Sequence, residues 1–279
     1  MNLSIQKDKT KNKMIKLTTF FTLILLVVLV FTSCKKEIEL NVAQATPKLV
    51  VEAIVTDSEN SYVRITKSKS IYDNEEPEAI NDADVSISDD QGNTFLFSNI
   101  NSFGYYALDG FIGVPGRTYT LDIDANGSHI TGVDKMLPRV DIEAITFRDI
   151  PISDDAEKQV LCHFQDDGET ENFYYFKVIE TPSPTPFGSY NTSRSDLLFN
   201  GLTTEVVMDR FFTLPGTTLN VYLYHVNKEN YKYLYTLSSI SGDGSFGGGS
   251  PGNPINTIDG DAIGFFGAWP ESSIEILVP

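Results

Sequence analysis

Cysteine is scarce in this sequence of 279 residues, which contains only Cys34 and Cys162. Two cysteines cannot build the disulfide framework that stabilises many small exported domains. Histidine is nearly as rare: His129, His163 and His225 are far apart in the sequence, without the H-x-x-x-H or H-E-x-x-H spacing that places two imidazoles on one helix face. The spacing therefore predicts no zinc site.

Positive charge is also in short supply, because 21 lysines and arginines face 38 aspartates and glutamates, for a formal net charge of −17. An acidic body of this kind is repelled by nucleic-acid phosphates and gains nothing from anionic lipid headgroups. No nucleic-acid partner is therefore expected.

The common catalytic motifs are missing. Gly247–Gly249 lacks the lysine and the serine or threonine of a phosphate-binding loop, and Gly244-Ser245-Phe246-Gly247 does not have the spacing of a G-x-S-x-G nucleophile elbow. Cys162 lies in the apolar run 160–164, which favours a buried thiol over a nucleophile. We predict no catalytic residue and a protein that is not an enzyme.

The N-terminus has the features of an export signal. Five lysines precede an apolar run of about 15 residues that ends at Thr32-Ser33-Cys34, too short for the roughly 20 residues of a membrane-spanning helix. The junction resembles a lipobox, with cleavage between Ser33 and Cys34 and lipidation (a palmitate-type acyl anchor) of Cys34. A retained membrane anchor, and secretion with Cys34 unmodified, remain as alternatives.

Removal of residues 1–33 would take away five lysines and one aspartate, which leaves a formal charge of about −21. Residues 34–48 are expected to form a lipidated tether. Lys35-Lys36 after Cys34 does not resemble an inner-membrane retention signal, so we expect an outer-membrane lipoprotein held by its lipid anchor.

Residues 49–138 are predicted to form a β-sandwich. Residues 84–88 and 118–123 alternate apolar with polar side chains, and turn residues such as Asn126-Gly127 separate strands at intervals of 8 to 12 residues. The segment GYYALDGFIGVPGRTYTLDI, residues 104–123, resembles a prealbumin-like or carboxypeptidase-regulatory-like module. The resemblance implies that its tyrosines pack at a corner and that Pro115-Gly116 forms a turn between strands.

Residues 139–279 are predicted to form a second, antiparallel β-rich domain, so that the fold class is mainly β. Strands are expected near 142–147, 159–164, 172–178, 220–225 and 262–269. Asn227 can cap a helix over residues 228–238, in which Tyr231, Leu234 and Tyr235 share a face.

The order of lipobox, prealbumin-like module, FQDDGETENFYYFKV run, tyrosine-rich helix, G-N-P loop and final G-F-F-G-A strand resembles the Bacteroidota lipoprotein family known as domain of unknown function 4249. The resemblance implies an accessory role beside a TonB-dependent receptor at the outer membrane. It favours a protein exposed on the cell surface over one that faces the periplasm. It implies no catalytic residues.

Two functional hypotheses follow. The first is a non-catalytic accessory lipoprotein that binds ligand or transporter through aromatic side chains; Tyr190, Phe246 and Trp269 are the candidate contacts, with core packing as their other role. The second is a lipid-anchored enzyme that acts on an extracellular polymer, indicated only by scattered acidic pairs. Those pairs also offer oxygen ligands for calcium, with solvated turns as the alternative. They are Asp89-Asp90, Asp154-Asp155, Asp166-Asp167 and the Asp259-Gly260-Asp261 loop. No other cofactor is expected.

Overall fold

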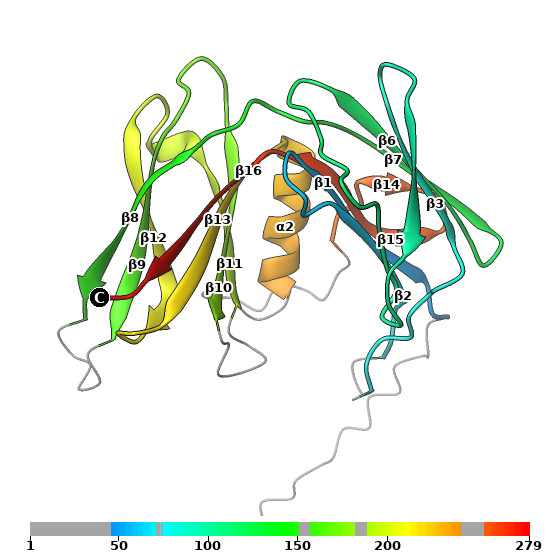
Figure 1. Cartoon of the computed structure of the whole chain (residues 1–279), viewed down its shortest axis with the longest axis horizontal. Helices are drawn as coiled ribbons and strands as arrows, with labels where there is room; N and C mark the ends of the chain where they lie inside the picture. Colours follow the sequence, from blue (N-terminus) through cyan, green and yellow to red (C-terminus); the bar gives the residue numbers. More distant parts are fainter. Residues whose placement is uncertain (1–45, 71–72, 74, 151–156, 182–188, 241–253) are drawn as a thin grey trace, which may run out of the picture. The chain divides into compact units, whose positions relative to one another are not determined.

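The computed structural model describes part of the chain, and Figure 1 draws the remaining residues in grey. The described residues are 46–279 without 71–72, 74, 151–156, 182–188 and 241–253. The expected signal segment 1–33, Ser33, Cys34, most of the tether 34–48, Asp154-Asp155 and Phe246 lie outside them. Among the described residues, none of the helices combines the length and apolar character that spanning a bilayer demands.

The first half of the described chain forms a β-sandwich, as predicted. Its nine-stranded sheet has the order β14-β7-β6-β3-β4-β5-β2-β1-β15, and it encloses a core in which Val51, Ile65, Leu121 and Ile123 are fully buried. The strands are β1 (Leu49–Thr56), β2 (Tyr62–Lys67), β3 (Asp84–Asp89), β4 (Thr94–Asn99), β5 (Tyr105–Ala107), β6 (Thr118–Ala125), β7 (Ser128–Lys135), β14 (Ile258–Asp259) and β15 (Ala262–Trp269).

The predicted hairpins are confirmed. β3 pairs antiparallel with β4, and β6 pairs antiparallel with β7 across the two-residue turn Asn126-Gly127. Asn126 and Gly127 have φ angles of 50° and 77°, the left-handed values that a tight hairpin turn requires.

Two buried tyrosines, Tyr106 and Tyr119, fix the loops of this sandwich. The Tyr106 hydroxyl donates to the Ile80 carbonyl at 3.0 Å and accepts the Ala83 N–H at 2.9 Å. The Tyr119 hydroxyl accepts the Val114 N–H at 2.7 Å, just before the Pro115-Gly116 turn. Each phenol ring therefore fills the core while its hydroxyl satisfies loop backbone groups.

A second sandwich has two antiparallel sheets, of order β11-β10-β13-β16 and β12-β9-β8 (Figure 1). Phe164, Phe176, Val221 and Leu223 are fully buried between them. The strands are β8 (Ile142–Asp149), β9 (Lys158–Gln165), β10 (Phe173–Thr181), β11 (Ser189–Ser195), β12 (Thr203–Thr213), β13 (Thr218–Val226) and β16 (Glu271–Leu277), with the 3₁₀ turn η1 (Asp196–Leu198).

The predicted boundary of the second domain, 139–279, needs a correction. β14 pairs with β7, and β15 pairs in parallel with β1, so residues 258–269 belong to the first sandwich, whereas β16 returns to the second. β15 is a nearly continuous buried run, and a strand covered on both faces is apolar at consecutive positions. Residues 45–279 accordingly cluster as one compact unit.

The predicted helix is present as α2 (Lys228–Ile240), two residues longer than expected. The Asn227 side chain accepts the Asn230 N–H at 2.8 Å, which confirms the predicted cap. α2 contacts β10, β11 and β15, and Asn230 donates to the buried Asp134 carboxylate at 3.0 Å. The same carboxylate accepts the Ala268 N–H at 2.8 Å, so it joins β7, α2 and β15.

Candidate functional site

A third apolar cluster lies where β1, β10, β13, β15 and α2 meet. Phe173, Tyr224, Tyr233, Phe265 and Trp269 are buried there, away from both sandwich cores. The Trp269 indole stacks on the Phe265 ring at 5.3 Å with an interplanar angle of 5°. Tyr224 contacts Trp269 at 5.9 Å, so the cluster is a continuous set of aromatic faces.

Glycine makes this stacking possible. A Cβ at Gly267 would lie 2.1 Å from the Trp269 Nε1, so the indole can lie back over this position towards Phe265 only because residue 267 has no side chain.

A cavity of about 510 Å³ opens beside the cluster. This volume falls within the range of small-molecule sites. Its walls are formed by every second residue of three strands: Glu52, Ile54 and Thr56 of β1; Tyr175, Lys177 and Ile179 of β10; Tyr222 and Tyr224 of β13. The period of two turns one face of each strand towards the cavity. The remaining lining comes from Asn60, Tyr62, Asn191, Leu234, Leu237, Ser238, Phe265 and Trp269.

The cavity carries one charge of each sign. Glu52 on β1 lies 3.5 Å from the Arg64 guanidinium. The backbone of Lys177 pairs within the sheet, but its side-chain ammonium has no hydrogen-bond or ion-pair partner in the part of the chain that the structure describes. Burial, with a contribution from Glu52, raises the pKa of Tyr62 and Tyr175, and for the same reasons raises that of Tyr233 to about 12. These phenols stay neutral at physiological pH and can donate hydrogen bonds.

The three candidate contacts predicted from the sequence have different surroundings. Trp269 lines the cavity but is fully buried, so its packing role dominates. Tyr190 packs on the second core, with its ring 5.9 Å from that of Phe211, and is not among the cavity-lining residues. Phe246 is outside the described residues.

The buried members of the acidic pairs already have protein partners. Asp89 accepts N–H groups of Gln91 and Asn93 and pairs with Arg117, and these contacts, led by the Asn93 side chain, hold its pKa below the usual value. Asp166 accepts the Tyr174 hydroxyl at 2.5 Å and the Gly201 N–H at 2.7 Å. The carboxylates thus organise loops, and the calcium expectation gains no support from either turn.

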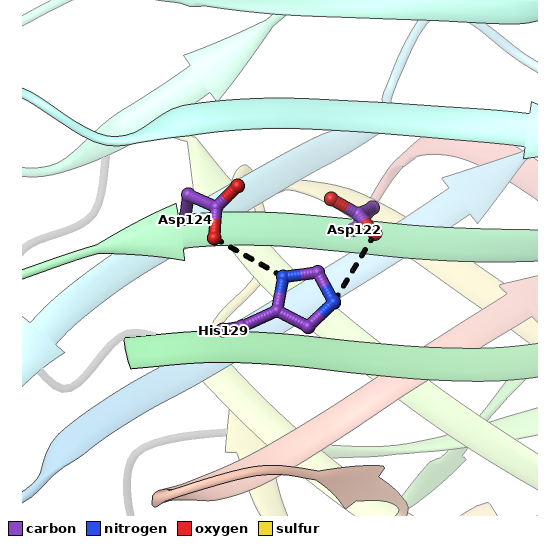
Figure 2. A group of neighbouring side chains, drawn as sticks. All are labelled: Asp122, Asp124 and His129. Carbon is purple, nitrogen blue, oxygen red and sulfur yellow. Dashed lines mark hydrogen bonds and ion pairs between the residues drawn. The ribbon is translucent and has the colours of Figure 1, made fainter. Parts of the chain in front are cut away.

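A second group of polar side chains lies on the outer face of the first sandwich (Figure 2). Asp122 and Asp124 are on β6 and His129 is on β7, and one ligand atom from each lies within 4.8 Å of the others. Both imidazole nitrogens face a carboxylate: Nδ1 is 3.1 Å from Asp124 Oδ1, and Nε2 is 3.6 Å from Asp122 Oδ2. Helical histidine spacing does not predict this group, because its residues are brought together by the hairpin at Asn126-Gly127.

His163 and His225 lie elsewhere. His163 Nε2 is 2.7 Å from the Thr146 hydroxyl, and His225 is buried between the Pro138 carbonyl and the Asn172 amide oxygen. Burial lowers the pKa of His225, and burial raises that of the Cys162 thiol to about 12, as expected for a structural residue.

Comparison with known proteins gives a family match. Residues 35–275 match the model described as domain of unknown function (DUF4249). A two-domain fibronectin type III segment of chicken tenascin aligns with 65% of this chain and 91% of its own, at 14% identity and a TM-score of 0.22. Domains FN1–FN3 of chicken CNTN1 align with 84% of this chain and 66% of their own, at 10% identity and a TM-score of 0.24. A comparison with curated proteins found no match.

Proposed function

We propose that this chain, which belongs to the family of domain of unknown function DUF4249, is a non-catalytic, lipid-anchored outer-membrane protein. In this proposal it binds an extracellular ligand beside a TonB-dependent receptor. The cavity of about 510 Å³ between β1, β10, β13, β15 and α2 is the observation that carries the binding role. It combines aromatic faces with amide, hydroxyl, carboxylate and ammonium groups, the composition of a site for a small amphiphilic molecule.

The walls of the cavity favour binding over mere packing. Tyr222 stacks on Tyr224 with an interplanar angle of 5°, and both rings project from one strand, β13. The Lys177 side chain projects from the neighbouring strand β10, and its ammonium has no partner among the described residues, so a ligand carboxylate could neutralise its charge. A site on paired strands is held rigidly before the ligand arrives, which lowers the entropic penalty of binding.

The proposed anchor is compatible with a receptor-side role. Fifteen residue steps separate Cys34 from the first strand residue, Leu49, and an extended chain of that length spans at most about 54 Å. Lipid chains at Cys34 would therefore keep the sandwiches near the membrane while leaving them free to contact a neighbouring barrel.

The test of the receptor role is a mild-detergent pull-down of the tagged full chain from its native membrane, with mass spectrometry of the recovered proteins. We expect a TonB-dependent barrel with the wild type and its loss with Cys34→Ala. Recovery of the protein alone in both cases would overturn the accessory role. Hydrolysis of an extracellular polymer that is abolished by one Asp→Asn change would replace it with the enzyme hypothesis.

The test of the cavity is small-molecule mass spectrometry of the same purified samples. We expect a ligand that is retained by the wild type and by Tyr235→Ala, a control on the exposed face of α2, but is lost in Tyr222→Ala. Equal retention by Tyr222→Ala and the wild type would place the ligand outside the cavity.

A further inference from the structure

We infer that His129 and Asp122 bind one divalent transition-metal cation of the zinc class on the outer face of the first sandwich, with Asp124 as the residue that orients the imidazole. This site goes beyond the proposed cavity function and rests on different residues, on β6 and β7.

The distances match the ligand spacing of such a cation. Zinc binds imidazole nitrogen and carboxylate oxygen at about 2.0–2.2 Å, so two ligands of a tetrahedral site lie about 3.4 Å apart. His129 Nε2 and Asp122 Oδ2 are 3.6 Å apart (Figure 2). A cation between these two atoms therefore needs only small side-chain adjustments.

Asp124 occupies the position of an outer-shell partner. Its Oδ1 lies 3.1 Å from His129 Nδ1, on the side of the ring opposite to the one that faces Asp122. An N–H on Nδ1 donated to this carboxylate leaves the lone pair of neutral imidazole on Nε2, where the cation would bind. Carboxylate–histidine–metal arrangements of this kind fix the tautomer and make the imidazole a better ligand.

The hairpin holds the three side chains in register. Asp124 pairs directly with His129 across the tight Asn126-Gly127 turn, and Asp122 is two residues further along β6, hence on the same face. Ligands on paired strands need little ordering when the cation binds.

The surroundings add negative charge and leave room for further ligands. Asp84 on β3 lies directly across from Asp124 in the sheet and is exposed, as are Asp124 and His129. The local potential therefore favours a cation. The exposed outer face leaves the other coordination positions to water or to an external ligand.

The competing interpretation is a purely electrostatic cluster, in which a protonated imidazole sits between two carboxylates. That cluster uses protons on both nitrogens and has no free lone pair for a metal. The two interpretations predict different results for added Zn²⁺: the metal site binds it at His129 Nε2, and the electrostatic cluster does not. Zinc is therefore the probe that separates them.

The experiment is calorimetric titration of Zn²⁺ into the detergent-solubilised full chain, purified without a histidine tag. We expect one site in the wild type, no binding by His129→Ala, and an affinity lowered about 10-fold or more by Asp122→Asn. Asp124→Asn keeps a hydrogen-bond acceptor but loses the charge, and we expect a loss of about 10-fold. The control His163→Ala removes a histidine that contacts a threonine hydroxyl and should bind as the wild type does.

A second measurement identifies the ligands. X-ray absorption at the zinc edge should show one imidazole with oxygen ligands in the wild type. The proposal is overturned if the wild type does not bind at millimolar Zn²⁺, if His129→Ala binds equally well, or if His163→Ala loses the site instead.

Discussion

Asp134 provides a sharp test of the packing between the sandwiches and α2. The carboxylate is 4% exposed and accepts hydrogen bonds from the Ala268 N–H, the Lys135 N–H and the Asn230 and Asn227 amides, without a cationic partner among the described residues. Burial raises its pKa from 3.8 to about 7, against the lowering effect of these bonds and with a smaller raising contribution from Glu229. The replacement Asp134→Asn removes the titration and keeps the shape.

The direction in which pH changes the free energy of unfolding follows from proton linkage. Below pH 3.8 the carboxyl is protonated in both states; between about pH 4 and pH 7 the unfolded chain ionises while the folded protein keeps the proton. The free energy of unfolding contributed by Asp134 therefore falls by about 1.4 kcal/mol per pH unit as pH rises, for a total of about 4 kcal/mol. His225, whose pKa burial lowers, has the opposite effect, because its contribution is lost as pH falls.

The assay is urea unfolding of the wild type and Asp134→Asn at pH 5 and pH 7. His225 is common to both proteins and cancels. We therefore expect the free energy of unfolding of the wild type, relative to that of Asp134→Asn, to fall by about 2 kcal/mol from pH 5 to pH 7. Asp89→Asn is the matched control: its low pKa leaves it ionised at both pH values in both states, and its difference should not change. A wild-type minus Asp134→Asn difference that is constant with pH would refute the reasoning.

Three further predictions concern packing. Gly264→Ala places a Cβ 1.9 Å from the Val51 carbonyl oxygen at a φ of 140°, so urea unfolding should show a free energy of unfolding lowered by more than about 2 kcal/mol. The control Gly92→Ala, with open space and a φ of 85°, should lower it by only about 1 kcal/mol. Equal losses of stability in the two variants would contradict this prediction. Phe164→Ala empties the centre of the second core and should lower the free energy of unfolding by about 3–5 kcal/mol, measured as a lower Tm in calorimetry. A Tm shift near zero would mean that the core repacks around the missing ring. The Cys162 thiol should not react with a thiol reagent until the protein is unfolded in guanidinium, and fast labelling of the native protein would show that it is accessible.

Local structure followed from the sequence wherever neighbouring residues determine it. The Asn126-Gly127 turn, the alternating strands on either side and the α2 cap at Asn227 depend on contacts within a few residues. The parallel pairing of β15 with β1 joins residues more than 200 positions apart, and an apolar run such as 262–269 does not encode its partner. The boundary of the second domain was placed wrongly for this reason.

The cavity could not be predicted for a related reason. Its lining comes from segments that are far apart in the chain, and Tyr175, Tyr222 and Lys177 look like ordinary outward residues of half-buried strands until the packing places a second surface opposite them. The Asp122, Asp124 and His129 group is different, because a two-residue hairpin fixes which residues pair. The turn at 126–127 pairs Asp124 with His129, so this group follows from strand register and not from helical histidine spacing.

β15 connects the candidate site to the fold. Its alternate residues Phe266 and Ala268 are buried in the first core, while Phe265 and Trp269 face the aromatic cluster beside the cavity. The Ala268 N–H is held by the Asp134 carboxylate, one residue away from the indole that lines the cavity. A change that shifts this strand therefore acts on the core and on the cavity together, so Asp134→Asn should be compared with the wild type for ligand retention as well as for stability.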